Sequence, residues 1–456
     1  MRTPSIGQTT PASPTFRRGL PLAALDPYLS DAEIDTICRQ FGRPFRHRVF
    51  SPGVTVRAMT YRGLSPDRSI RSVLAELDTT RDPDASPLTA PAFCQARDRL
   101  AETVWTVLRD RSVTRLTDLA GDRHLFHGRP VYATDGSSLS MPDTPELVQA
   151  FGYTKTRHGR SRFPVARFTL LIRHGVEAII DYRLGPYTDC EDAHFQSMWH
   201  HLPKGAICLG DRRFGSFYNL AKLLARGVDY LGRLYQRRDP DRLIAAGRKI
   251  GRGEWLVTLT LAPQLRKRYN DPTLPDTLTI RLIRVRFRRG KGKKRHTVWL
   301  ITTLLDPVAF PRRELVRLYR KRWGIETRFG SLKTTLQLNV LRSQTAAHVR
   351  TEVAATVLAH NLVWTVIHQA VHRHGLPADR VSFIGAARAL LLFSPILRFT
   401  QGAERVRIYE HMLARVRADT NPLRPNRVEP RLIKREPVRY AYLRIPRAQA
   451  REKCLS

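Results

Sequence analysis

The sequence is poor in three features that define whole classes of protein. Cysteine occurs only five times in 456 residues, at widely spaced positions and without a Cys-x-x-Cys pair. We therefore expect reduced thiols, because a disulfide framework or a structural zinc site would need more closely grouped ligands. No apolar run of about 18 residues occurs, so no membrane-spanning helix is expected. The N-terminal segment also lacks the apolar centre of a secretory signal.

Acidic residues are scarce relative to basic ones. The chain contains 78 Lys and Arg residues against 40 Asp and Glu residues, a formal net charge of +38, and its sequence pI is about 11.1. An excess of this size, spread over the whole length, indicates a polyanionic partner. Nucleic acid is the first candidate and a membrane surface the second. Hydrophobic residues make up 42% of the chain, enough for a folded core of more than one domain.

Composition and periodicity change along the chain and divide it into segments. Short apolar runs bounded by Gly, Asp and Pro are typical of strands, whereas longer runs with a period near 3.6 are typical of helices. We expect a Pro-, Ser- and Thr-rich disordered tail at 1–20, helices at 21–125, an α/β segment at 126–225, basic strands at 226–305, helices at 306–370, and a helical then irregular basic region at 371–456.

Residues 51–79 have the pattern of two helices joined by a turn at Gly63 to Asp67. Arginines lie on or beside both helices, at positions 57, 62, 68 and 71. A basic helix pair resembles a helix-turn-helix, which would suit duplex DNA. The alternative is a solvated surface, and the sequence favours neither strongly.

Residues 281–295 contain nine basic residues and no acidic one. The alternation of Arg281, Arg284 and Arg286 with apolar residues predicts a two-faced strand that ends in a basic turn. A strand edge protected by charge is one interpretation. Because a chain of this charge needs no further solubilising, we favour a groove that follows DNA phosphates. Its expected contacts are Arg288, Arg289, Lys291, Lys293 and Lys294.

Residues 318–333 place charged groups along one side of an expected helix. At about 100° per residue, Tyr319, Arg322, Glu326 and Lys333 fall within a sector about 60° wide. Apolar residues lie beside this sector, so the helix would dock on a core and hold a carboxylate and two cations at the rim of the buried surface. Any one of these residues alone would be an ordinary surface charge.

Two further carboxylates close strand-like runs. Asp135 ends VYAT and opens the turn DGSS, and Asp211 ends GAICLG. Each alone has the simple explanation of a turn or a cap. Together with Glu326 they can converge at one edge of a sheet, and three hard oxygen ligands suit Mg²⁺ or Mn²⁺. Carboxylates so close would also repel one another unless a cation joined them.

Such a site predicts chemistry at phosphorus. Two Mg²⁺ or Mn²⁺ ions about 4 Å apart activate a water or a 3′-hydroxyl and stabilise the leaving oxygen of an in-line displacement. Asp135, Asp211 and Glu326 would then be the catalytic, metal-binding residues. Arg322 and Lys333 would hold the neighbouring phosphates, and Tyr319 would hydrogen-bond to one.

The spacing Tyr-x2-Arg-x3-Glu-x6-Lys, met by Tyr319, Arg322, Glu326 and Lys333, resembles the signature of the insertion-sequence-four family of DDE transposases. The resemblance covers about residues 125–370. Asp135 in ATDGSS and Asp211 in GDRRF are similar to the other two acids of that family.

The resemblance implies an α/β ribonuclease-H-like catalytic core with a β-rich insertion between Asp211 and Glu326. An all-α, DNA-binding N-terminal domain would precede this core, and a helical or irregular basic region would follow it. It also implies aromatic contacts with DNA bases, from Trp323 beside the signature Arg and from Trp299 in the insertion. A tryptophan in a strand is, however, more often a core residue.

The expected function is that of a DNA transposase. It would bind the terminal inverted repeats of its own element, cut DNA by metal-dependent hydrolysis and join the freed 3′ end to a target, acting as a homodimer when two ends are synapsed. Two alternatives stay open: a structure-specific nuclease of the same fold, and a non-enzymatic DNA-binding protein derived from a transposase. The partner would be double-stranded DNA, without a membrane, in the bacterial cytoplasm and at the nucleoid through its DNA.

Overall fold

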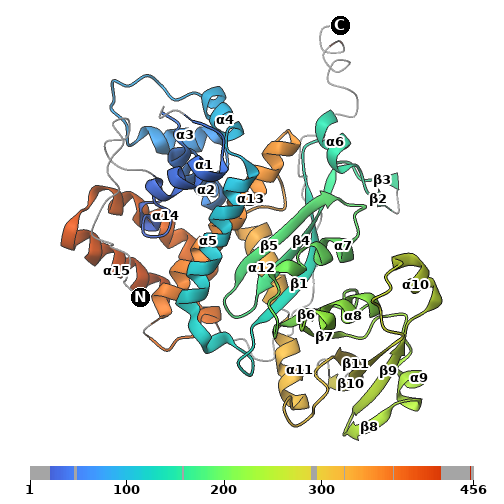
Figure 1. The fold of residues 1–456 in the computed structure, drawn as a ribbon. Coiled ribbons are helices and arrows are strands. Elements are labelled where there is room, and N and C mark those ends of the chain that lie inside the picture. The colour runs from blue at the N-terminus through green and yellow to red at the C-terminus, as the bar shows by residue number, and fades with distance from the viewer. Residues whose placement is uncertain are drawn as a thin grey trace.

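A mixed sheet of nine strands runs through the described part of the chain, with helices packed around it (Figure 1). The structure is a computed structural model, and it describes residues 21–45, 49–156, 159–288, 295–322, 324–372, 374–422 and 452. The α/β class expected from the sequence is confirmed.

Five strands form one half of the sheet, in the order β5-β4-β1-β6-β7. They are β1 (Val131–Ser140), β4 (Val165–Arg173), β5 (Ala178–Pro186), β6 (Ile207–Gly210) and β7 (Asp229–Arg233). Strands β1, β4 and β5 are antiparallel neighbours, whereas β6 and β7 run parallel to β1. The carboxyl end of β6 therefore lies at the same edge as the second half of β1.

Four more strands extend the same sheet beyond β7. These are β11 (Arg295–Thr302), β10 (Thr277–Arg288), β9 (Glu254–Thr260) and β8 (Arg248–Gly251), each antiparallel to its neighbours. The strands expected in the basic segment are thus confirmed, and they continue the sheet of the preceding segment. A separate two-stranded ribbon joins β2 (Lys155–Thr156) to β3 (Gly159–Arg160).

Helices cover this sheet at several places (Figure 1). Helix α7 (Glu191–Ser197) contacts β4, α8 (Phe217–Ala225) contacts β7, α12 (Gly324–Gly330) contacts β1, and α5 (Glu102–Ala120) and α13 (Ala346–Val371) contact β5. The other α-helices are α1 (Asp31–Phe41), α2 (Pro52–Leu64), α3 (Ile70–Asp78), α4 (Ala90–Asp98), α6 (Pro145–Phe151), α9 (Pro240–Ala245), α10 (Pro263–Tyr269), α11 (Arg312–Lys321), α14 (Phe383–Phe399) and α15 (Gly402–Ala418). Among the described helices, none has both the length and the apolar character to cross a bilayer.

Helix α13 is buried along most of its length and joins the N-terminal helices to the sheet. It packs against α5 and α2 on one side and β5 on another. Its Glu352 accepts a hydrogen bond from Arg68 Nη2 at 3.0 Å. Its Asn361 exchanges two hydrogen bonds with the backbone of Ile179 in β5, at 2.9 and 3.1 Å. Both polar groups are fully paired in the interior, as buried polar groups must be.

The expected helix pair at residues 51–79 is present as α2 and α3, but its arginines do not form a DNA-binding face. Arg57 and Arg68 are each only 1% exposed. Arg57 pairs with Asp26 and Asp31, and Arg68 pairs with Glu352. Arg62 is also buried against Glu352, at 3.7 Å. The hypothesis of DNA contact is therefore wrong for these three arginines, because internal carboxylates bind them. Arg71 is exposed.

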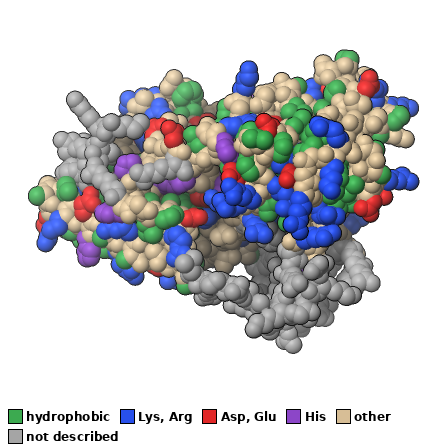
Figure 2. Space-filling view, turned by 90° about the horizontal axis from the view of Figure 1, so that it is seen from below, with side chains coloured by type: hydrophobic (Ala, Val, Ile, Leu, Met, Phe, Trp, Pro, Cys, Tyr) green, Lys and Arg blue, Asp and Glu red, His purple; other side chains and the backbone are tan. Residues whose placement is uncertain are grey.

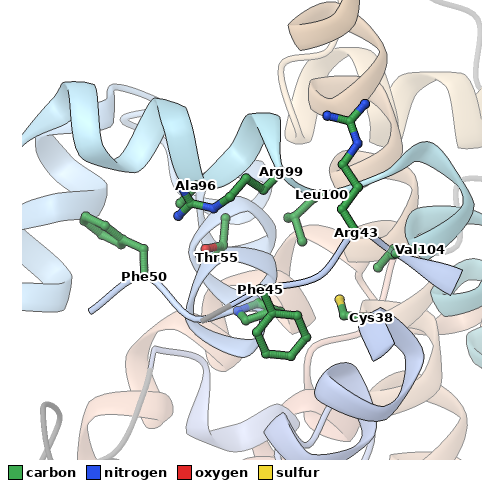
Figure 3. A pocket seen from close by; sticks show the side chains of 11 residues that line it. Cys38, Arg43, Phe45, Phe50, Thr55, Ala96, Arg99, Leu100 and Val104 are labelled. Carbon is green, nitrogen blue, oxygen red and sulfur yellow. The ribbon is translucent and has the colours of Figure 1, made fainter. Parts of the chain in front are cut away.

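A small cavity lies among the N-terminal helices α1, α2 and α4 (Figure 3). Its volume is about 20 Å³, room for about one water molecule. Cys38, Phe45 and Thr55 point into it. Burial raises the pKa of the Cys38 thiol to about 11, and the charge of Asp35 acts in the same direction. The cavity is a packing gap beside an unreactive thiol, not a ligand site.

Candidate active site

Asp135 and Asp211 meet at one edge of the sheet. Strands β1 and β6 pair in parallel, with Ala133 level with Leu209. Two residues further along, this register brings Asp135 level with Asp211, on strands about 4.8 Å apart. Residues two apart in a strand face the same side, so both carboxylates leave the same face of the sheet. The convergence expected from the sequence holds for this pair.

The environment of Asp135 favours a bound cation. Burial raises the pKa of its carboxyl group to about 6, and the charges of Asp211 and Glu191 act in the same direction. A hydrogen bond from the Gly136 N–H and the nearby Arg322 oppose that rise. A half-buried carboxylate surrounded by other carboxylates is stabilised when a positive ion neutralises the group.

Asp211 is held by its own loop and by a buried tyrosine. Its Oδ1 accepts a hydrogen bond from the backbone N–H of Arg213 at 2.8 Å. Its carbonyl oxygen accepts one from the Tyr230 hydroxyl at 2.9 Å. Gly210 leaves room for that hydroxyl, since a Cβ atom at this position would lie 2.5 Å from it. No local signal predicted this role for Tyr230, which has the pattern of an ordinary strand residue.

Arg322 connects the first and third carboxylates. Its Nη1 atom lies 3.5 Å from Asp135 Oδ2, and its Nη2 atom lies 3.7 Å from Glu326 Oε1. The Arg322 side chain is 7% exposed, whereas that of Glu326 is 48% exposed. Burial alone would lower the pKa of Arg322, but the charges of Tyr319, Asp135 and Asp211 raise it overall. One guanidinium group therefore faces all three acids of the predicted triad.

The sequence predicted one regular α-helix over residues 318–333, but the structure has an interrupted helix there. Helix α11 ends at Lys321, and the N–H groups of Arg322 and Ile325 bond to carbonyls only three residues earlier. After α12 the chain widens into a π-turn at Ser331–Thr335, closed by a bond from Leu336 N–H to Ser331 O at 2.9 Å. Arg322 lies between Asp135 and Glu326, and its contact with Glu326 keeps the four-residue spacing of a helix although the helix is interrupted at Arg322.

The other residues of the signature lie close to this site. Tyr319 is 7% exposed, and the Cζ atom of Arg322 lies 5.7 Å from the centre of its ring. Burial raises the pKa of Tyr319, and Arg322 opposes the rise. The Tyr319 ring thus packs against the Arg322 guanidinium. Lys333 lies in the π-turn and is half-buried.

The predicted aromatic and basic contacts of the insertion are described only in part. Trp299 of β11 is half-buried, with its ring centre 5.9 Å from that of Trp255. The guanidinium of Arg284 lies 5.4 Å from the Trp255 ring and 5.9 Å from the Trp299 ring. Arg288 ends β10, but its side chain is not among those described. Five predicted residues lie outside the described part of the chain: Arg289, Lys291, Lys293, Lys294 and Trp323.

Arg281 does not belong to a basic surface, contrary to the predicted alternation of β10. It is fully buried, and its Nε donates to Glu254 Oε2 at 2.8 Å. It also donates to the carbonyls of Asp306 and Phe310, at 3.2 and 2.8 Å. The residue is an internal link between β9, β10 and the loop that leads to α11.

A fourth carboxylate, Glu191, was missed in the sequence. It is the first residue of α7, and its carboxyl group lies against Gly136, beside Asp135. It pairs with Arg167 and lies 3.6 Å from Arg213 Nε. Nothing in the local sequence distinguishes it from neighbouring acids, because its position depends on how α7 packs on β4.

The donor set fits a hard divalent cation. Asp135, Asp211 and Glu326 supply only oxygen ligands, which Mg²⁺ and Mn²⁺ prefer. Within the described residues, the group whose ligand atoms all lie within 4.8 Å of one another is a different one, namely Asp181, His200 and His201. Its carboxylate is already paired with Arg109 and Arg183, however, so two cations occupy the place a metal would need. Asp135, Asp211 and Glu326 stay the predicted metal ligands, because all of their donors are oxygen atoms.

Comparisons with known proteins identify a family of DNA-cutting enzymes. A family model described as "Transposase DDE domain" matches residues 126–362, more than half of the chain. The chain is 27% identical over 431 residues to "Transposase InsG for insertion sequence element IS4" of Escherichia coli K12, covering 92% of this chain and 93% of that protein. It is 30% identical over 167 residues to "Putative transposase InsZ" of the same organism, covering 35% and 54% of the two chains.

A solved structure of the piggyBac transposase in a synaptic complex with hairpin DNA is also similar, with a TM-score of 0.45 and 10% identity over 87% of this chain and 85% of the other. The family match spans all three acids of the predicted triad. The chain belongs to the DDE transposases, as its resemblance to the insertion-sequence-four family implied, and it is an enzyme that cuts and transfers DNA.

Proposed function

We propose that the protein excises its own insertion sequence at the terminal inverted repeats and joins the freed 3′ ends to target DNA. Asp135, Asp211 and Glu326 are the metal ligands in this proposal. The observation that carries it is the position of Arg322, which faces Asp135 and Glu326 at 3.5 and 3.7 Å while Asp135 is level with Asp211. In this proposal the three carboxylates, which come from distant parts of the chain, act on the same metal ions.

Bound Mg²⁺ or Mn²⁺, as two ions, would supply the activated oxygen nucleophile and stabilise the leaving oxygen. The protein holds the three metal ligands in position. Tyr230 and the Arg213 N–H fix Asp211, and Arg322 keeps Asp135 and Glu326 apart and oriented before metal enters. In this proposal Arg322 and Lys333 would also hold a phosphate next to the scissile bond.

Basic side chains beyond the site support a DNA track. Helix α11 lies at the lower end of the molecule in Figure 1, and the face seen from below in Figure 2 carries clusters of Lys and Arg side chains. The exposed basic residues of α11 are Arg313, Arg317, Arg320 and Lys321. Arg288, Arg289, Lys291, Lys293 and Lys294 would continue the track, while Trp323 and Trp299, the latter beside Trp255 and Arg284, would contact bases.

The strand order supports a ribonuclease-H-like core. An antiparallel β5-β4-β1 unit followed by parallel β6 and β7 is the arrangement expected of that fold, built from residues 126–225 and 306–370 with 226–305 as the insertion. Residues 21–125 would contribute to binding of transposon ends, and 371–456 would add basic contacts. A homodimer would hold two ends together, at the nucleoid of a bacterial cell.

Strand cleavage tests this function. Purified full-length protein is mixed with duplexes taken from the inverted repeats that bracket its reading frame, with and without Mg²⁺. We expect metal-dependent cutting and end joining by the wild type, and binding without cutting by Asp211→Asn. Cutting without joining would favour the nuclease alternative, and equal binding with no cutting by either protein would favour a binding protein.

A further inference from the structure

A cleft opens beside Asp211, between the catalytic strands and the insertion. Its volume is about 930 Å³, at the upper end of the ~300–1,000 Å³ range of ligand sites. One wall carries acids from α7 and from the end of β6, namely Glu191, Asp192 and Asp211. The opposite wall belongs to the insertion and carries Tyr235, Arg238, Leu265, Arg268 and Tyr269. The proposed metal site therefore opens into a second, larger space.

The insertion wall presents a cation that lacks an acidic partner. Arg238 is half-buried, and within the described residues no carboxylate pairs with its guanidinium. Burial lowers its pKa, and only Tyr235 opposes this. Withdrawing a guanidinium from water without an anion is costly, so the site is incomplete until an anion arrives. Arg268 also lines the cleft and is exposed.

The same wall presents an immobilised aromatic ring. Tyr269 ends α10, and its ring stacks on Tyr218 of α8 with centres 3.8 Å apart and planes 9° apart. The guanidinium of Arg268 lies 5.5 Å from the Tyr269 ring. Arginines beside fixed aromatic rings are the usual combination for binding unpaired nucleotides, whose phosphates and bases they contact separately.

The volume of the cleft favours a single strand over a duplex as the ligand. A space of about 930 Å³ has the size of a small-ligand site, which suits a few unpaired nucleotides better than a double helix. The Trp299 cluster does not line this cleft, so the two features are separate.

We propose that this cleft holds unpaired nucleotides of the strand that leaves the active site at Asp211, with Arg238 and Arg268 on phosphates and Tyr269 against a base. The inference rests on the proposed function, because it takes Asp211 as a metal ligand at the scissile phosphate. The wall with Glu191, Asp192 and Asp211 would then face the metal ions. The wall with Arg238 and Arg268 would face the sugar-phosphate backbone of the departing DNA strand.

Matched variants of α10 test the proposal. Arg268 lines the cleft, whereas Arg266, on the same helix, pairs with Asp276 and does not line it. The probe is a fluorescent oligodeoxythymidine of about 15 nucleotides, compared with a blunt duplex of the same length. We expect Arg268→Gln to weaken single-strand binding about tenfold and to reduce the slope of log K against log salt by about 0.7. Arg266→Gln should change neither quantity.

A second variant separates stacking from charge. Tyr269→Leu should weaken single-strand binding by about tenfold while leaving the salt slope unchanged, since a base contact releases no counterion. Thermal melting verifies that both variants fold. Duplexes with an unpaired extension of about four nucleotides on the 5′ or the 3′ strand then identify which strand enters the cleft.

Two outcomes would overturn the proposal. One is an equal loss in Arg268→Gln and Arg266→Gln, which would mean a general effect of charge. The other is an equal loss for the blunt duplex and the single strand. Metal-dependent cleavage is measured in parallel: a wild type that does not cut refutes the proposed function, whereas intact cutting with unchanged single-strand binding in Arg268→Gln refutes the cleft alone.

Discussion

The carboxyl group of Glu191 lies against Gly136, where a Cβ atom would be only 2.7 Å from Glu191 Cδ. Gly136 follows Asp135 directly, so the fit of α7 against β1 is tied to the position of a predicted metal ligand. A side chain at position 136 would thus have to displace the end of the Glu191 side chain, whereas the backbone angles of Gly136 set no such limit.

Replacing Gly136 with alanine should therefore impair cutting. The added methyl would displace Glu191 and shift Asp135 by a few tenths of an ångström to an ångström, and misplacement of that order reduces catalysis by up to about 100-fold. Single-turnover strand cleavage measures the effect. Gly330→Ala is the control, because a Cβ atom at this helical position meets nothing within 4 Å. Equal activity of the two variants would contradict the prediction.

Glu191→Gln should weaken metal binding. Loss of this charge removes a carboxylate beside Asp135 and breaks the pair with Arg167, so we expect a roughly tenfold lower affinity for Mn²⁺. Electron paramagnetic resonance of free Mn²⁺ measures the affinity without any need for cutting. Asp189→Asn, two residues earlier and paired with His194, is the matched control and should retain wild-type affinity.

Arg322→Lys should impair cleavage although the charge is kept. An ammonium group cannot face Asp135 and Glu326 at once, because it lacks the planar fork of the guanidinium. We expect a loss of about 2 kcal/mol in transition-state stabilisation, or about 30-fold in the rate of cleavage. Arg266→Lys, at an exposed arginine outside the proposed DNA contacts, should cut at the wild-type rate. A fully active Arg322→Lys enzyme would refute the bridging role.

Glu352→Gln should destabilise the whole fold. Burial alone would raise the pKa of Glu352, but Arg62 and Arg68 hold it below its usual value. Removing the charge leaves two buried guanidinium groups unpaired, at a cost of about 3–5 kcal/mol. Urea unfolding measures the change. Glu404→Gln, whose exposed pair with Arg407 spans 3.8 Å, should cost less than about 1 kcal/mol.

The stability of the protein should decrease in mild acid. Burial lowers the pKa of His360 to about 3 and that of His368 to about 4. Below pH ~6.5 the unfolded chain binds protons at these positions that the folded chain does not, so stability falls by up to about 1.4 kcal/mol per pH unit for each group. Urea unfolding between about pH 4 and 7 tests this. His360→Asn should show a smaller slope, and an unchanged slope would refute the assignment.

The sequence could predict the three acids of the proposed triad because each of them has a local signal. Asp135 and Asp211 each end an apolar strand, and Glu326 belongs to a spacing that few chains match by chance. Register between β1 and β6 then aligns the two aspartates without further information. The strands of the insertion were likewise visible in their alternation.

Contacts between distant segments account for what the sequence did not reveal. Arg57, Arg62 and Arg68 looked like a basic surface because Glu352, which pairs with two of them, lies nearly 300 residues further along. Glu191 looked like any acid at a helix start until α7 was seen to pack on β4. The tight turn at Arg322 interrupts the regular helix that the spacing from Tyr319 to Lys333 had indicated.

Helix α13 joins two parts of the molecule that are far apart in the chain. Through Glu352 it contacts the N-terminal helices, and through Asn361 it contacts β5, so its buried middle section holds both parts together. If the N-terminal helices bind a DNA end, as proposed, this helix would set the distance from that end to Asp135 and Asp211. The position of the cut would then depend on the dimensions of the protein.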